Sequence, residues 1–296
     1  MTSGACRGQR DEVSRTLNRL EKKVVLVTGS TQGIGRQIAT AVATEGACVV
    51  VTGRNEEKGH AVVADIAGAG GEAMYVRMDV TRPEMVEGAV RATVERYGRL
   101  DGLVNNVADM TLARVDGPLT ELEVEDWNLI IATDLTSAFL GMKFGIRAML
   151  QGGHGGAVVN IASEAGLRGV NGIDGYTASK GAIVALTRSV ASYYARYDIR
   201  CNTLAVGFVD TGEERIRELL ENPEYANRIR NHHMGIVGRP NQVAPAAVFM
   251  LSDEAEYISG AILPVDGGAA AASHIAMTQH PDIPGIPRLR PHAPEY

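Results

Sequence analysis

Short apolar runs that favour β-strands alternate with amphipathic helical patterns through the middle of this chain of 296 residues. The alternation begins with VVLVT at 24–28 and ends with AILPV at 261–265. Strands separated by helices favour βαβ units, whose right-handed crossovers build a parallel sheet covered on both faces. The runs are apolar throughout, as strands buried on both faces should be. We therefore predict one α/β domain with a doubly wound, Rossmann-like parallel sheet.

The hydrophobic patterns also place the elements and divide the chain. Strands are expected at 24–28, 48–52, 73–78, 101–105, 157–162, 199–206 and 261–265. Helices are expected at 34–45, 55–68, 83–98, 125–150, 176–197, 214–231 and 241–251. We assign 1–20 to an N-terminal extension, 21–272 to the Rossmann-like domain with a lid at about 212–239, and 273–296 to a proline-rich arm.

The C-terminal arm holds five of the chain's 11 prolines, which exclude a helix there. Two alternatives remain for this arm. It is either a disordered end or an extended segment packed on a neighbouring subunit.

Composition excludes several classes of protein. The net charge is −6, no basic run is present, and aromatic residues make up only 5%, so nucleic acid and anionic membrane are not expected partners. The 45% of apolar residues excludes a disordered chain. The three cysteines are widely spaced and no metal-ligand pattern is present, so no metal is expected. Without an apolar N-terminal stretch or a run of ~20 apolar residues, we expect a soluble cytoplasmic protein.

A glycine cluster, TGSTQGIG, follows the first predicted strand and opens the first predicted helix. This is the position of a phosphate-binding turn. Gly29, Gly33 and Gly35 would let the backbone approach a diphosphate, and the helix N-terminus supplies N–H groups and positive potential. The sequence therefore predicts a dinucleotide site.

A second cluster comprises Ser163 at the end of a predicted strand, with Tyr176 and Lys180 on a helix. The tyrosine and lysine are one turn apart and share a helix face. An ammonium beside a phenol stabilises the phenolate and lowers its pKa from ~10. Tyr176 is thus a candidate proton donor and acceptor.

Together these motifs resemble those of the short-chain dehydrogenase/reductase family, over about residues 21–272. Asn105 and Asn106 begin its NNAG signature, and VDGG at 265–268 is a familiar ending of the domain. The resemblance implies contacts with a nicotinamide cofactor from the glycine turn, the pair after the third strand, the NNAG segment, the catalytic helix and the carboxamide-binding loop. These residues are Gly29, Thr31, Gln32, Gly33, Ile34, Gly35, Arg54, Asp79, Val80, Asn106, Ala108, Tyr176, Lys180, Gly207, Val209 and Thr211.

The resemblance also implies a mechanism. Ser163 would polarise the substrate carbonyl, Tyr176 would transfer the proton, and Lys180 would lower the tyrosine pKa and hold the nicotinamide ribose. Substrate is expected to touch Ser163, Glu164 and Tyr176. The predicted reaction interconverts a ketone and a secondary alcohol. The alternatives are a 3-oxoacyl-thioester reductase, an NAD-dependent catabolic alcohol dehydrogenase, and a non-catalytic cofactor sensor.

Two positions depart from the family pattern. Asp134 stands where the family usually has an asparagine that holds a water leading from the lysine to solvent. Its negative charge predicts a tight ion pair with Lys180, less phenolate at Tyr176, and an altered pH dependence. Ala108 replaces the glycine of NNAG and lies near the expected nicotinamide site.

The cofactor preference depends on the end of the second strand. Gly53 stands where NAD-dependent members carry an acidic residue, and Arg54 follows it. Because arginine suits a 2′-phosphate, we predict a preference for NADP(H), with NAD(H) as the alternative. Gln32 in the turn, where a basic residue is usual, weakens this preference.

The family resemblance further implies a homotetramer or homodimer formed through the helices at 125–150 and 176–197. Phe139, Phe144, Tyr193 and Tyr194 are expected to be exposed apolar residues on these helices.

Overall fold

The computed structural model describes residues 18–226 and 237–271, which form a three-layer α/β sandwich. Its seven strands form one sheet in the order β3-β2-β1-β4-β5-β6-β7, and every neighbouring pair is parallel. The strands are β1 (Val24–Val27), β2 (Cys48–Gly53), β3 (Glu72–Arg77), β4 (Gly102–Asn105), β5 (Gly156–Ser163), β6 (Ile199–Val206) and β7 (Ile262–Val265). The order reverses between β1 and β4, and ligands of such sheets bind at the carboxyl ends of the strands there.

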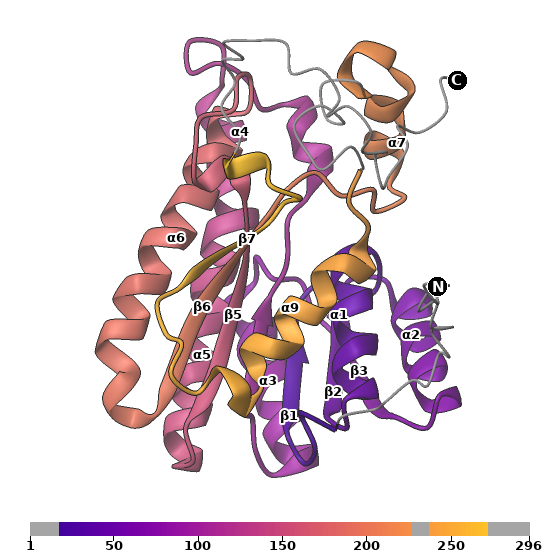
Figure 1. Cartoon of the computed structure of the whole chain (residues 1–296), viewed down its shortest axis with the longest axis vertical. Helices are drawn as coiled ribbons and strands as arrows, with labels where there is room; N and C mark the ends of the chain where they lie inside the picture. The colour runs from indigo at the N-terminus through magenta and orange to yellow at the C-terminus, as the bar shows by residue number, and fades with distance from the viewer. Residues whose placement is uncertain (1–17, 227–236, 272–296) are drawn as a thin grey trace, which may run out of the picture.

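Helices cover both faces of the sheet, as predicted (Figure 1). One face packs against α1 (Gly33–Thr44), α2 (Glu56–Gly68) and α9 (Pro240–Leu251). The other packs against α3 (Pro83–Tyr97), α5 (Ser137–Gly152) and α6 (Asp174–Tyr194). These contacts confirm the doubly wound α/β fold.

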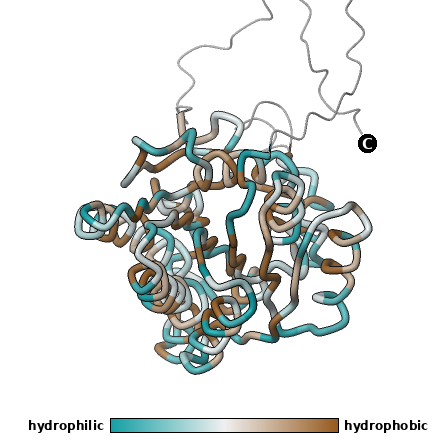
Figure 2. The backbone as a smooth tube through the Cα atoms, turned by 90° about the horizontal axis from the view of Figure 1, so that it is seen from below, coloured by the Kyte–Doolittle hydropathy of each residue, from teal (hydrophilic) through white to brown (hydrophobic). Residues whose placement is uncertain are grey.

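The strand side chains enter two separate cores. Val25 and Val27 pack on the α1 side of the sheet, whereas Leu26 between them packs on the α3 side. All three are almost fully buried, which explains why the strand sequences show no polar alternation. Figure 2 shows hydrophobic segments running through the middle of the molecule.

The helix predicted at 125–150 is not one regular α-helix. α4 (Val124–Ile130) passes into a π-helical turn, Ile131–Thr136, before α5 begins at Ser137. π-turns inside α-helices are frequent at functional sites. The whole stretch Val124–Gly152 is long and apolar enough to cross a membrane, but 56% of its most apolar window is buried inside the fold, as in the core helix of a soluble protein.

Other details correct the predicted boundaries and exposures. Leu20 is fully buried, so the folded domain begins before residue 21. Phe144 was expected at the surface but is buried, because it lies on the side of α5 that packs in the second core. In the predicted lid, α7 spans only Glu214–Glu221. The region 1–17, the lid part 227–236 and the arm 273–296 lie outside the described residues.

Candidate active site

The turn between β1 and α1 has a backbone that only glycine fits. Gly33 has a φ of +57°, in the left-handed region that favours glycine. A Cβ on Gly35 would lie 2.4 Å from the carbonyl oxygen of Gly29. The N-cap residue of α1, Gln32, makes no side-chain capping hydrogen bond, so the first N–H groups of α1 lack a cap of their own. Such a helix start suits an anionic diphosphate.

Asn106 fixes this turn to the end of β4. Its backbone N–H donates to Oγ1 of Thr28 at 2.9 Å, and its side-chain amide donates to the carbonyl of Thr28 at 3.0 Å and of Gly29 at 3.2 Å. The amide of Asn106 therefore holds the turn in shape. Ala108 follows on the same loop and is half-buried.

Arg54, at the end of β2, faces carboxylates. Its guanidinium lies 3.6 Å from the carboxylate of Asp109, on the loop after β4. Burial works to raise the pKa of Asp79, but hydrogen bonds from Thr81 and the charges of Arg54 and Arg82 hold it below its usual value. Arg54 is thus a cation with anionic neighbours on two loops.

The cofactor residues next to Arg54 lie close to the sheet. A Cβ at Gly53 would come 2.6 Å from Cγ2 of Thr31, so an acidic side chain at 53 would crowd the glycine turn. Ile34 and Val80 are partly buried, and their side chains pack against the two cores.

The loop after β6 returns to the glycine turn. The N–H of Gly207 donates to Val265 at 3.1 Å, and Val209 forms an isolated parallel bridge with Gly238. The side chain of Thr211 then lies against the turn, with its Cβ 3.5 Å from the place that a Cβ on Gly33 would take. Its hydroxyl oxygen is buried, and the hydroxyl interacts with the carboxylate of Glu213.

Ser163, Tyr176 and Lys180 come together at the carboxyl end of β5. Ser163 ends the strand, and its Oγ accepts a hydrogen bond from the N–H of Ala165 at 3.1 Å. Tyr176 and Lys180 lie on the first two turns of α6, with Nζ of the lysine 5.3 Å from the centre of the tyrosine ring. Lys180 is only 1% exposed.

Burial dominates the protonation of this group. It raises the pKa of the Tyr176 phenol far above its ordinary value, and the charge of Asp134 adds to the effect, while a hydrogen bond with Ser163 opposes it. Burial also lowers the pKa of Lys180, against the attraction of Asp134. The pKa of the phenol is thus raised in this structure, whereas the resemblance implied that Lys180 lowers it.

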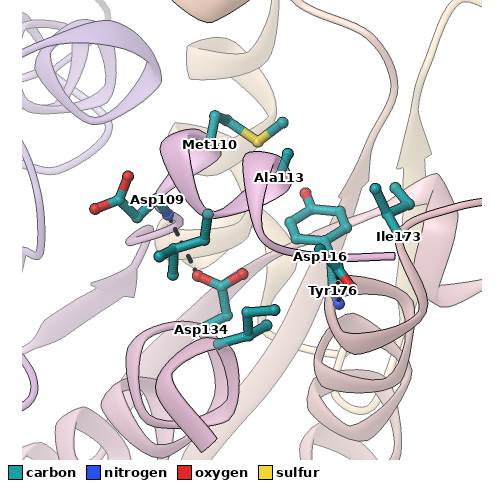
Figure 3. A pocket seen from close by; sticks show the side chains of 9 residues that line it. Asp109, Met110, Ala113, Asp116, Asp134, Ile173 and Tyr176 are labelled. Atoms are coloured by element: carbon teal, nitrogen blue, oxygen red, sulfur yellow. Dashed lines mark hydrogen bonds between the residues drawn. The ribbon is translucent and has the colours of Figure 1, made fainter. Parts of the chain in front are cut away.

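Asp134 projects from the π-turn into the same pocket, where it is 1% exposed. Its Oδ1 accepts a hydrogen bond from the N–H of Asp109 at 3.3 Å (Figure 3). Burial raises the pKa of Asp134, with opposing contributions from Lys180 and from that hydrogen bond. The predicted tight ion pair is not formed, since no contact within 4.0 Å joins Asp134 to Lys180 in the described structure. The two charges attract one another at longer range.

The pocket beside Tyr176 is lined by both acidic and apolar side chains. Asp109, Asp116 and Asp134 line it together with the phenol (Figure 3). The enclosed space is about 20 Å³, enough for one water molecule. The other lining residues are Met110, Leu112, Ala113, Ile130 and Ile173.

Asp116 fixes the start of the catalytic helix. Its carboxylate accepts hydrogen bonds from the N–H groups of Gly175 and Tyr176, both at 2.9 Å. The sequence analysis missed this residue, because it lies 60 positions before the tyrosine that it supports. A capping residue is recognisable in a sequence only when it directly precedes its helix.

Glu164, which was predicted to contact the substrate, is paired with an arginine of the same loop. It forms an ion pair with Arg168, whose other guanidinium nitrogen donates to the carbonyl of Ala269 at 2.6 Å. The pair ties the loop after β5 to the chain that follows β7.

Comparisons with known proteins identify the family. A family model described as enoyl-(acyl carrier protein) reductase matches residues 29–270. Cyclopentanol dehydrogenase of Comamonas sp. (strain NCIMB 9872) is 37% identical over 86% of this chain and 100% of its own length. Cyclohexanol dehydrogenase of Acinetobacter sp. (strain SE19) is 36% identical over 84% and 96%. The crystal structure of a putative gluconate dehydrogenase from Agrobacterium tumefaciens superposes with a TM-score of 0.80 at 31% identity, covering 86% of this chain and 98% of the other.

The chain belongs to the short-chain dehydrogenase/reductase family.

Membership makes this short-chain dehydrogenase an oxidoreductase that acts on CH–OH groups with NAD(P)(H). The residues present fit such a cofactor. The glycine turn leaves no room for side chains where a diphosphate approaches, and the side chain of Thr211 lies against that turn. The cofactor site and the Ser163–Tyr176–Lys180 group both lie at the carboxyl end of the sheet.

Proposed function

We propose that this short-chain dehydrogenase interconverts alicyclic secondary alcohols and their ketones. The observation that carries the proposal is the similarity to a cyclopentanol dehydrogenase and a cyclohexanol dehydrogenase, at 37% and 36% identity. The oxygen of such a ring substrate would be held between Ser163 and the phenol of Tyr176.

The proposed chemistry assigns one task to each residue. The bound cofactor supplies the hydride acceptor in oxidation and the hydride donor in reduction. Ser163 hydrogen-bonds the substrate oxygen, and Tyr176 removes the hydroxyl proton in oxidation or returns it in reduction. Lys180 holds the nicotinamide ribose, and its positive charge favours the phenolate. Asp134 holds a water in the small pocket, through which the proton exchanges with solvent.

The test is a substrate panel. Cyclopentanol and cyclohexanol should be turned over with a kcat/KM at least about tenfold above that of linear primary alcohols of equal carbon number, if the enzyme shares the substrate class of these relatives. Equal kcat/KM values for the two series would contradict the proposal.

We also propose a preference for NADP(H), supported by Gly53 in place of an acidic residue and by the guanidinium of Arg54. The observation that favours the alternative, NAD(H), is the pairing of Arg54 with Asp109, because a 2′-phosphate must compete with that carboxylate. Arg54→Gln should weaken NADPH binding about tenfold and leave NADH binding unchanged. Arg36→Gln is the matched control, since Arg36 pairs with Asp65 on α2. Equal effects of Arg54→Gln on both cofactors would favour the NAD(H) alternative.

A second candidate substrate is a 3-oxoacyl thioester, which the description of the matching family model favours. Acetoacetyl-CoA reduction measures it directly. A kcat/KM for this thioester above that of the cyclic ketones would replace the proposed substrate class.

We further propose that α5 and α6 pair with a second copy of the chain, as expected for a homodimer or homotetramer. A groove of about 350 Å³ lies between these helices, beside the exposed Phe139. Phe139→Glu should lower the mass measured by light scattering, whereas Tyr257→Glu, at a fully exposed site away from the groove, should not. An unchanged mass of the Phe139 variant would contradict this interface.

A further inference from the structure

Glu213, the N-cap residue of α7, extends its side chain over the glycine turn. One carboxylate oxygen lies 3.8 Å from the place that a Cβ on Gly33 would take. Hydrogen bonds join the carboxylate to the side chain of Gln32, the N-cap residue of α1, and to the side chain of Thr211. The side-chain oxygen of Gln32 in turn accepts from Nζ of Lys58 at 2.7 Å. Glu213 is therefore part of a polar chain that crosses from α7 to α2 directly above the turn.

The carboxylate of Glu213 is partly buried and lies at the start of α1. The start of α1 carries positive potential, and its first turn contains no acidic residue of its own. The side chain of Glu213 is half-buried, and burial together with the nearby charge of Asp109 raises its pKa. It makes no capping hydrogen bond to α7, so the stability of its own helix does not account for its position.

We propose that Glu213 is a built-in competitor of the cofactor, whose carboxylate occupies the anion-binding turn until the cofactor's diphosphate displaces it. The inference rests on the proposed cofactor site and adds an affinity-determining residue to it. Displacement moves Glu213 away from Gln32 and takes the start of α7 with it. Cofactor binding and movement of this lid helix are thus one event.

The test measures nucleotide binding without turnover. Glu213→Gln keeps the size of the side chain and removes its charge, and it should tighten binding of ADP and of NADPH by about tenfold. Binding of adenosine, which lacks the diphosphate, should not change. Glu214→Gln is the matched control, because Glu214 is the adjacent, exposed glutamate of the same helix and should leave all three affinities as they are.

Three results would overturn the inference. These are equal ADP affinities for the Glu213 and Glu214 variants, weaker ADP binding by Glu213→Gln, and an equal gain for adenosine. The proposed function is tested separately, because it fails when the wild-type enzyme turns over no cyclic alcohol, whereas the ADP titration reports on Glu213 in either case.

Discussion

The cofactor turn and the catalytic pocket lie at the same end of the sheet but are built in opposite ways. The turn is held by backbone geometry and by uncharged hydrogen bonds from Asn106. The pocket is held by buried charges, with Lys180 facing Asp134 and with Asp109 and Asp116 beside the phenol. Substitutions that change side-chain size should therefore impair the cofactor turn most, and substitutions that change charge should impair the catalytic pocket most.

The largest effect is expected at the proton-transferring group. Tyr176→Phe removes the hydroxyl and should lower kcat about 10³-fold, in the usual range for a lost general acid or base. The Kd for NADPH should stay within about twofold, because the cofactor turn is untouched. Steady-state kinetics and fluorescence titration measure the two quantities. Full activity of this variant would exclude the phenol as the proton carrier and would favour the non-catalytic sensor.

A steric change in the glycine turn should act mainly on cofactor binding and stability, and not on the proton-transfer step. Gly35→Ala places a methyl group 2.4 Å from a carbonyl oxygen and should lower the free energy of unfolding by about 1–3 kcal/mol. It should also weaken NADPH binding by about tenfold or more, since the turn has to widen. Gly68→Ala is the control, because no atom lies within 4 Å of its added Cβ. Chemical denaturation and NADPH titration of both variants test whether the turn depends on the absence of a side chain at Gly35.

The carboxylate at the start of α6 should contribute mainly to stability. Asp116→Ala leaves the N–H groups of Gly175 and Tyr176 without their acceptor and should cost about 1–2 kcal/mol, as the loss of a helix cap does. The misplaced phenol should also lower kcat. Glu121→Ala, at an exposed position on the same connection, should change neither the denaturation midpoint nor kcat.

The smallest effect should be a displaced pH profile. Asp134 raises the pKa of Tyr176, so the phenol of the wild type loses its proton only at alkaline pH. Because Asp134→Asn removes that negative charge, the Tyr176 pKa should fall, and alcohol oxidation should reach its plateau at lower pH. The maximal kcat should change less than tenfold. A profile of kcat against pH that coincides with that of the wild type would show that the charge of Asp134 does not act on the phenol.

The sequence predicted the cofactor half well, because its signals are local. A strand, a glycine turn and a helix are consecutive in the chain, and each of Gly29, Gly33 and Gly35 has a steric reason that follows from its place in the turn. The fold class and the family follow from the same pattern. The grouping of Ser163, Tyr176 and Lys180 was also predictable, since two of the three are one helical turn apart.

The charges around the pocket were not predictable to the same degree. Asp116 and Glu213 act on backbone and turn residues that are distant in sequence, and neither sits in a recognisable motif. The sequence shows the departure at Asp134 but not its distance to Lys180, because that distance depends on how the π-turn orients the aspartate. Pair distances across a core follow from packing and not from spacing along the chain.

The π-turn also sets the rotational phase between the two halves of one long helix. An α-helix advances about 100° per residue, so one extra residue in a turn rotates everything beyond it by about that angle. Deleting a single residue between Ile131 and Thr136 would leave a regular helix of the same direction. It would also turn α4 and Asp134 relative to Phe139 and the outer face of α5. The catalytic pocket and the groove between α5 and α6 are thus kept in register by one surplus residue, so the length of this segment matters as much as its chemistry.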